Sequence, residues 1–131
     1  MFAATNAARS ETNGSPKVLV VDDETVITDT LAAVLRNSGY TVQTAYNAST
    51  AIALAQEFAP DLLITDVVMP GMNGIEMAIR IRDLFPLCKV LLFSGQAATA
   101  DLLADAERRG YNFELLVKPI HPTDLLAKLR F

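Results

Sequence analysis

The stretch that decides the fold is KVLVVDDE, residues 17–24, in which an apolar run ends directly at three acidic residues. A short run rich in β-branched residues is typical of a strand that is covered on both faces of a parallel sheet. A carboxylate placed against such a buried strand is unfavourable unless another group compensates its charge. The position of Asp22, Asp23 and Glu24 therefore indicates a charged site that needs a partner.

Outward from this stretch, strand-like and helix-like segments alternate. Apolar and β-branched runs predict strands at residues 17–21, 40–45, 62–64, 89–93 and 113–117. Helical periodicity and capping residues predict helices at about 24–38, 47–58, 73–84 and 99–109, with a short last helix from Pro122. Five strands alternating with five helices predict an α/β fold with a parallel sheet and right-handed crossovers.

Local chemistry predicts where the helices begin and end and which side chains they bury. Asn47 can cap the second helix, Pro60 prevents its continuation, and Gly39 and Gly110 can end the first and the fourth. The side chains expected to face the core are Ile27, Leu31, Val34 and Leu35 in the first helix and Ile75, Ala78 and Ile79 in the third.

Composition places the chain among soluble cytoplasmic proteins with one domain. Its 131 residues are 51% hydrophobic, enough for one core, and we expect residues 1–15 to form a disordered tail before a domain at 16–131. A single cysteine, Cys88, suits a reducing cytoplasm, and residues 1–16 lack the apolar core of a secretory signal. A net charge of −4 argues against direct nucleic-acid binding, and no apolar run is long enough to span a membrane.

Polar side chains follow four of the predicted strands. Asp22 and Asp23 follow the first strand, Asp66 the third, Ser94 the fourth and Lys118 the fifth. Ligands of parallel α/β sheets lie at the carboxyl ends of the strands, so these residues are expected to converge. Three carboxylates would repel each other without a cation, and an all-oxygen ligand set favours Mg²⁺ over zinc. A lysine suits a phosphoryl group, and an aspartate can itself accept one as an acyl phosphate.

Four motifs occur in order at these strand ends, namely DDE at 22–24, DVVMPGMNG at 66–74, SG at 94–95 and KP at 118–119. Together they resemble the receiver domains of response regulators in two-component signalling, over about residues 17–130. The resemblance implies a flavodoxin-like, doubly wound (βα)5 three-layer sandwich whose five-stranded parallel sheet has the order 2-1-3-4-5.

The resemblance also implies the roles of the acidic residues. Asp66 matches the aspartate that accepts the phosphoryl group, Asp23 the direct ligand of Mg²⁺, and Asp22 a partner that acts mainly through water. Val68 matches the position whose backbone carbonyl binds the metal. Ser94 matches the hydroxyl that contacts the phosphoryl group, and Lys118 the lysine of the site. The peptide bond before Pro119 matches one that is usually cis.

One departure from the family concerns the switch. Receiver domains usually carry Tyr or Phe three residues before the lysine, where Leu115 stands in this chain, and the nearest aromatic on the same face is Phe113. The spacing from Gly110 to Lys118 is also one residue longer than usual. We therefore expect the loop of Ser94, Gly95 and Gln96 and the start of the fourth helix to carry most of the change, and Leu115 to stay buried in both states.

The resemblance implies a signalling role rather than a dedicated enzyme. A sensor histidine kinase or a phosphotransfer protein would phosphorylate Asp66, and the surface of helix four, strand five and helix five would contact an unknown downstream protein. The domain would catalyse only its own phosphorylation and dephosphorylation. No output domain is visible in the sequence, so the chain acts by contact with another protein or is part of a longer one.

Two alternatives remain open at this point. A phosphatase of the haloacid-dehalogenase type would need aspartates spaced D-x-D, but Glu24 stands two places after Asp22. That reading also leaves Asp66 without a role. A pseudo-receiver would bind partners without phosphorylation, and the intact set of Asp23, Asp66 and Lys118 argues against it.

Overall fold

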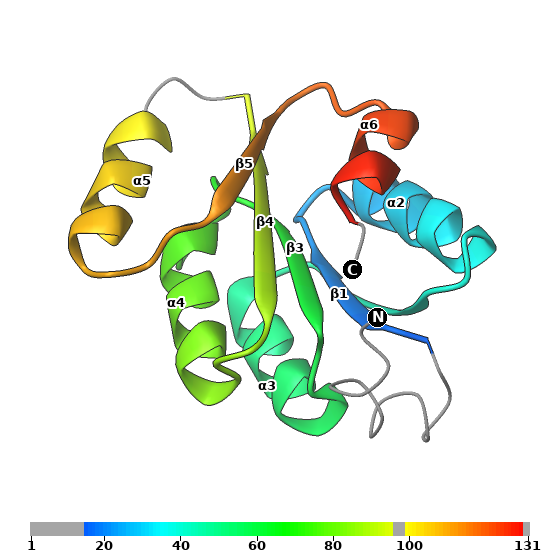
Figure 1. Ribbon diagram of the computed structural model, residues 1–131, viewed down its shortest axis with the longest axis horizontal. Coiled ribbons are helices and arrows are strands. Elements are labelled where there is room, and N and C mark those ends of the chain that lie inside the picture. Colours follow the sequence, from blue (N-terminus) through cyan, green and yellow to red (C-terminus); the bar gives the residue numbers. More distant parts are fainter. Residues whose placement is uncertain (1–14, 96–98, 130–131) are drawn as a thin grey trace.

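The computed structural model describes residues 15–95 and 99–129, so the predicted tail lies outside the described residues except for Ser15. The sheet contains β1 (Lys17–Val21), β2 (Thr41–Ala45), β3 (Leu62–Asp66), β4 (Lys89–Ser94) and β5 (Glu114–Val117). All neighbouring pairs are parallel, in the order β2-β1-β3-β4-β5 (Figure 1). The predicted doubly wound sheet is therefore confirmed.

Helices cover both faces of the sheet (Figure 1). They are α2 (Thr25–Asn37), α3 (Ala48–Phe58), α4 (Gly74–Leu84), α5 (Thr99–Arg108) and α6 (Pro122–Lys128). Residues of α2 and α6 share one apolar cluster with the sheet, and residues of α3, α4 and α5 share the other. This arrangement is the expected three-layer sandwich. No helix in the described ranges combines the length and apolar character needed to cross a membrane.

Side-chain caps set the starts of α3 and α4. The Asn47 side chain accepts a hydrogen bond from the Thr50 N–H at 2.9 Å, as the sequence predicts. Asn73 caps α4 in the same way, accepting from the Glu76 N–H at 2.9 Å. The end of α3 is also as expected, because the chain leaves the helix at Ala59, directly before Pro60.

Four strand borders differ from the prediction, and one of them is the end of β4, which reaches Ser94. β2 begins at Thr41 because the Tyr40 N–H still donates to the Leu35 carbonyl at the end of α2, 3.1 Å away. β3 continues to Asp66, which pairs with Phe93 of β4. β5 begins at Glu114, so Phe113 precedes the strand and does not belong to it.

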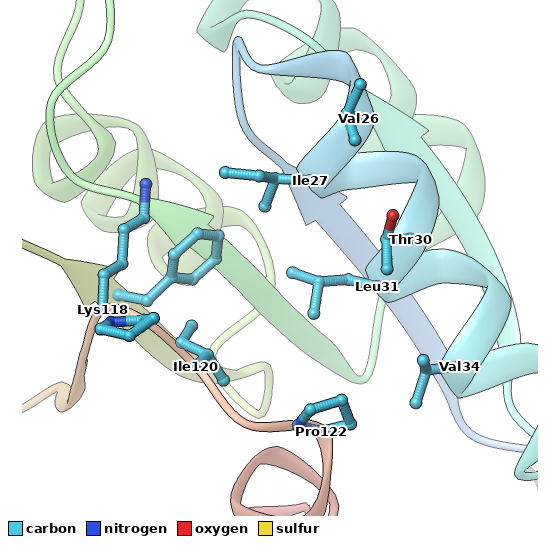
Figure 2. A pocket seen from close by; sticks show the side chains of 10 residues that line it. Val26, Ile27, Thr30, Leu31, Val34, Lys118, Ile120 and Pro122 are labelled. Carbon is cyan, nitrogen blue, oxygen red and sulfur yellow. The ribbon is translucent and has the colours of Figure 1, made fainter.

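Helix α2 buries only part of its predicted inward face. Leu31 and Leu35 are buried, but Ile27 and Val34 are only half-buried. Both lie at a groove between α2 and the segment that leads into α6 (Figure 2). The expectation that all four side chains are in the core is therefore wrong for two of them, because α6 covers only part of α2.

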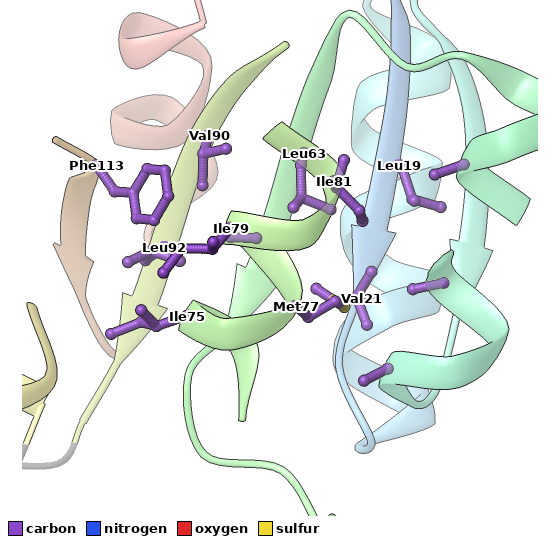
Figure 3. Packing of buried hydrophobic residues seen from close by; sticks show 14 of the residues in the cluster. Leu19, Val21, Leu63, Ile75, Met77, Ile79, Ile81, Val90, Leu92 and Phe113 are labelled. Carbon is purple, nitrogen blue, oxygen red and sulfur yellow. The ribbon is translucent and has the colours of Figure 1, made fainter. Parts of the chain in front are cut away.

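The larger core cluster lies between the sheet and α3, α4 and α5. Leu19, Val21 and Leu63 of the sheet are fully buried there, on the face that α3 and α4 cover (Figure 3). The predicted inward residues of α4 are buried as expected: Ile75, Ala78 and Ile79. Cys88 is also part of this cluster, and burial raises the pKa of its thiol to about 12. The cysteine therefore packs as a small apolar side chain.

Candidate functional site

The carboxylate of Asp22, the residue that follows β1, lies inside the protein. The Asp22 N–H continues the strand pairing by donating to the Ala45 carbonyl at 3.2 Å, and the side chain is fully buried. One carboxylate oxygen, Oδ1, accepts from the Glu24 N–H at 3.0 Å. Thr28 fixes the same turn from α2, because its hydroxyl donates to the Asp22 carbonyl at 2.9 Å. The strand end and the first turn of α2 thus hold Asp22 in place.

Asp22, Asp23 and Asp66 form one acidic cluster. Each supplies a carboxylate oxygen, and these three oxygens lie within 4.8 Å of one another. Asp22 and Asp66 are buried and Asp23 is exposed. The structure therefore brings together the three carboxylates that the sequence places at the ends of two strands.

The two buried carboxyl groups of the cluster are electrostatically unfavourable as they stand. Burial raises the pKa of Asp22 to about 6, and the negative charge of Asp66 adds to the increase against the lowering effects of the Glu24 N–H and Lys118. Burial also raises the pKa of Asp66. Among the described residues, the Asp22 Oδ2 atom has no hydrogen-bond partner. An all-oxygen donor set with an unsatisfied buried oxygen fits a hard divalent cation such as Mg²⁺.

Lys118 lies at the centre of the charged groups. Its Nζ atom is 3.4 Å from Asp66 Oδ1, 3.6 Å from Asp22 Oδ2 and 3.9 Å from a carboxylate oxygen of Glu24. The backbone holds it at this edge, because the Lys118 N–H donates to the Ser94 carbonyl at 3.1 Å. The peptide bond between Lys118 and Pro119 is cis. Glu24 was not among the predicted site residues, although the DDE motif contains it.

Asp66 lies at the base of a tightly folded loop. The Val67 N–H donates to Asp66 Oδ1 at 2.9 Å, and the Gly74 N–H donates to the Val67 carbonyl at 2.7 Å. This second bond brings the start of α4 back onto the end of β3. Val68 follows at the surface, with 50% of its area exposed. The loop thus fixes the carboxylate of Asp66 at the edge of the sheet.

Ser94 does not stand alone at the end of β4. Its hydroxyl lies 2.6 Å from the hydroxyl of Thr99, the first residue of α5, and both residues are buried. The sequence prediction missed Thr99. The only sequence signal was its place at the start of a predicted helix, and that does not reveal which residue it contacts.

Comparisons with known proteins agree with this geometry. The model of the response regulator receiver domain family matches residues 18–130. The chain belongs to this family. It is a receiver domain of two-component signalling, and the family match does not favour the alternative of a phosphatase.

Both curated sequences and solved structures support the assignment. The receiver domain is 34% identical over 119 residues to the probable transcriptional regulatory protein TcrX of Mycobacterium tuberculosis, covering 90% of this chain and 50% of TcrX. It is 36% identical over 110 residues to the DNA-binding transcriptional regulator NtrC of Azospirillum brasilense, covering 84% of this chain and 22% of NtrC. The chain thus spans half or less of the length of these curated relatives.

Among solved structures, the receiver domain resembles a CheY-like receiver domain protein of Methanospirillum hungatei, with a TM-score of 0.80 and 28% identity. That match covers 88% of this chain and 91% of the other. It also resembles chemotaxis protein CheY4 of Vibrio cholerae, with a TM-score of 0.79 and 30% identity over 88% of this chain and 97% of CheY4.

The switch region of this receiver domain differs from the expectation in one respect. Leu115 pairs with Leu92 and packs against the core, but it is only partly buried, because β5 is an edge strand. Phe113 is instead buried, and the Arg82 guanidinium lies 5.4 Å from the centre of its ring. The expectation that Leu115 is buried is therefore wrong for this structure, and Gln96 of the predicted switch loop lies outside the described residues.

A groove of about 470 Å³ opens beside the acidic cluster, between α2 and the segment before α6 (Figure 2). Val26, Ile27 and Leu31 line it from α2, and Ile120 and Pro122 from the other side. Lys118 lies at its edge, so the groove is continuous with the site of the receiver domain. Sequence reasoning did not predict this groove.

Proposed function

We propose that this receiver domain accepts a phosphoryl group on Asp66. The observation that carries the proposal is the position of its carboxylate, buried at the end of β3, 3.4 Å from the Lys118 ammonium and clustered with Asp22 and Asp23. A nucleophilic carboxylate flanked by a cation and by a candidate metal site suits attack on phosphorus.

The chemistry assigns a task to each side chain. An Asp66 oxygen forms a bond to phosphorus while the bond from phosphorus to the donor nitrogen breaks and its electron pair stays on nitrogen. Lys118 neutralises charge on the phosphoryl oxygens, and the Ser94 hydroxyl donates a hydrogen bond to one of them. A bound Mg²⁺ would stabilise the remaining negative charge of the transferring group. The protein would catalyse no reaction beyond this phosphorylation and the hydrolysis of the product, in which water attacks phosphorus and the Asp66 carboxylate leaves.

The three aspartates of the acidic cluster would have different roles in binding Mg²⁺. Asp23 and Asp66 are proposed as direct ligands together with the backbone carbonyl of Val68, and Asp22 as a partner of a metal-bound water. The burial of Asp22 supports this division, since its carboxylate is already fixed by the Glu24 N–H. A water-mediated contact would still supply a hydrogen bond to the Asp22 Oδ2 atom, which has none among the described residues.

We infer that the phosphoryl donor is a protein, either a sensor histidine kinase or a phosphotransfer protein, and that an unidentified protein reads the phosphorylated state. The net charge of −4 does not favour direct nucleic-acid binding by this chain.

The family match at 18–130 supports a receiver unit of about residues 16–131. We also propose a cytoplasmic location, because the single Cys88 suits a reducing compartment.

Incubation with phosphoramidate and Mg²⁺ tests the reaction without a partner protein. Intact-protein mass spectrometry is expected to show the addition of one phosphoryl group, because the site contains a single proposed nucleophile. Chelation of the metal with EDTA is expected to prevent it. No mass increase in the presence of Mg²⁺, or an equal increase with EDTA, would contradict the proposal.

The apolar groove is proposed as the contact surface for the phosphoryl donor. A donor must bring its phosphohistidine to Asp66, and the groove extends from Lys118 along α2. A partner surface with exposed apolar side chains can fill such a groove while its histidine reaches the site.

Val26→Glu is expected to reduce phosphoryl transfer from a partner kinase by roughly tenfold or more, because it places a charge in an apolar contact. Val26 is 76% exposed, so the fold is expected to tolerate the change. Phosphorylation by phosphoramidate is expected to stay unchanged. Leu87→Glu is a matched control, since Leu87 is 98% exposed two residues before β4, and so lies at the amino ends of the strands, away from the site. Equal kinase transfer to Val26→Glu and to the control would show that the donor binds elsewhere.

A further inference from the structure

The hydrogen bond between Ser94 and Thr99 joins the site to a helix. Ser94 is the last residue of β4 and Thr99 the first of α5, and their hydroxyl oxygens are 2.6 Å apart. Ser94 is 4% exposed and Thr99 is 2% exposed, so water does not compete for the bond. This distance lies at the short end of the range for hydrogen bonds between hydroxyl groups.

We propose that Thr99 is a positioning residue that holds the Ser94 hydroxyl in its resting orientation and thereby opposes phosphorylation. The inference rests on the proposed function, in which Ser94 donates its one proton to a phosphoryl oxygen on Asp66. Either hydroxyl can be the donor in the resting bond. In both cases the Ser94 oxygen must turn from α5 toward the end of β3 to reach a phosphoryl oxygen, and this turn breaks the bond to Thr99. A hydrogen bond to a charged phosphoryl oxygen is stronger than one between two neutral hydroxyls, so the exchange is favourable overall.

The loss of this bond affects one end of α5 more than the other. A buried Thr99 hydroxyl that loses its partner is unfavourable, and this penalty falls on the first turn of the helix. The opposite end is tied to α4, because Arg109 forms an ion pair with Glu76 at 2.8 Å and the Tyr111 hydroxyl donates to Asp83 at 2.6 Å. Phosphorylation would therefore change the start of α5 while its other end stays in place.

Titration with beryllofluoride and Mg²⁺ tests the role of Thr99, because beryllofluoride binds the aspartate as a phosphoryl mimic. Thr99→Val removes the hydroxyl and keeps the shape of the side chain. We expect it to bind beryllofluoride about fivefold to tenfold more tightly than the wild type, an effect the size of one hydrogen bond. Thr99→Ser, which restores the hydroxyl, is expected to bind as the wild type does. Calorimetry or ¹⁹F NMR measures the affinities.

The same substitution in a Ser94→Ala variant shows whether Thr99 acts through its hydrogen bond to Ser94 or only through the packing of its side chain. In Ser94→Ala the partner hydroxyl is missing, so adding Thr99→Val is expected to leave the affinity unchanged. An equal tightening in both backgrounds would overturn the proposal, as would equal or weaker binding by Thr99→Val alone. If Thr99→Val folds poorly, Thr99→Ala also removes the hydroxyl and must change the affinity in the same direction. Failure of the wild type to bind beryllofluoride would instead overturn the function at Asp66, and the role of Thr99 with it.

Discussion

Asp66→Asn is expected to abolish phosphorylation by phosphoramidate, lowering the rate by more than roughly a thousandfold. The amide nitrogen and oxygen of asparagine are poor nucleophiles, and no other carboxylate of the cluster occupies the end of β3. Mass spectrometry of the intact protein, under conditions in which the wild type gains one phosphoryl group, measures the loss.

The asparagine variant is expected to fold normally, which makes the result interpretable. Its side-chain oxygen can still accept the hydrogen bond from the Val67 N–H, and one negative charge leaves a crowded acidic cluster. Asp101→Asn is a suitable control, because Asp101 is exposed on α5 outside the cluster. It should be phosphorylated at the wild-type rate. Undiminished labelling of Asp66→Asn would place the acceptor at another residue.

Gly74→Ala is expected to lower the free energy of unfolding by about 3 kcal/mol or more, because the added methyl group overlaps backbone atoms. A Cβ atom at Gly74 would overlap the carbonyl oxygen of Asp66. It would also lie 2.9 Å from the carbonyl carbon of Asp66 and 3.1 Å from the hydroxyl oxygen of Thr65. Neither the strand end nor the helix start can move away without disturbing the acceptor loop. Thermal unfolding should show a melting temperature lower by roughly 10 °C or more.

Gly39→Ala provides the comparison for this variant. Gly39 has a φ of 97°, so alanine is strained there, but a Cβ atom would meet no other atom within 4 Å. The expected loss is about 1 kcal/mol, from the left-handed backbone alone. If the two variants lose the same stability, the close approach of α4 to Asp66 does not constrain the loop. If Gly74→Ala loses more, the position of the acceptor depends on this glycine.

The sequence alone determined the architecture and the residues of the acidic cluster. Apolar runs of strand length and helical periodicity are local patterns, and strict alternation leaves a parallel sheet as the arrangement that buries both faces. Because the carboxyl ends of parallel strands share one edge, Asp22, Asp66 and Lys118 had to lie close together. Caps such as Asn47 were also visible, since a helix start depends on residues that are neighbours in the chain.

Contacts between distant segments were decided only by the tertiary structure. The overlap that excludes a side chain at Gly74 depends on how α4 returns to β3, and the Ser94–Thr99 bond depends on where α5 begins over the sheet. The same holds for the groove, since only the placement of α6 leaves Ile27 half-buried where periodicity predicted a core residue. Periodicity records which face of an element is apolar, whereas the extent of its coverage depends on the neighbouring elements that pack against it.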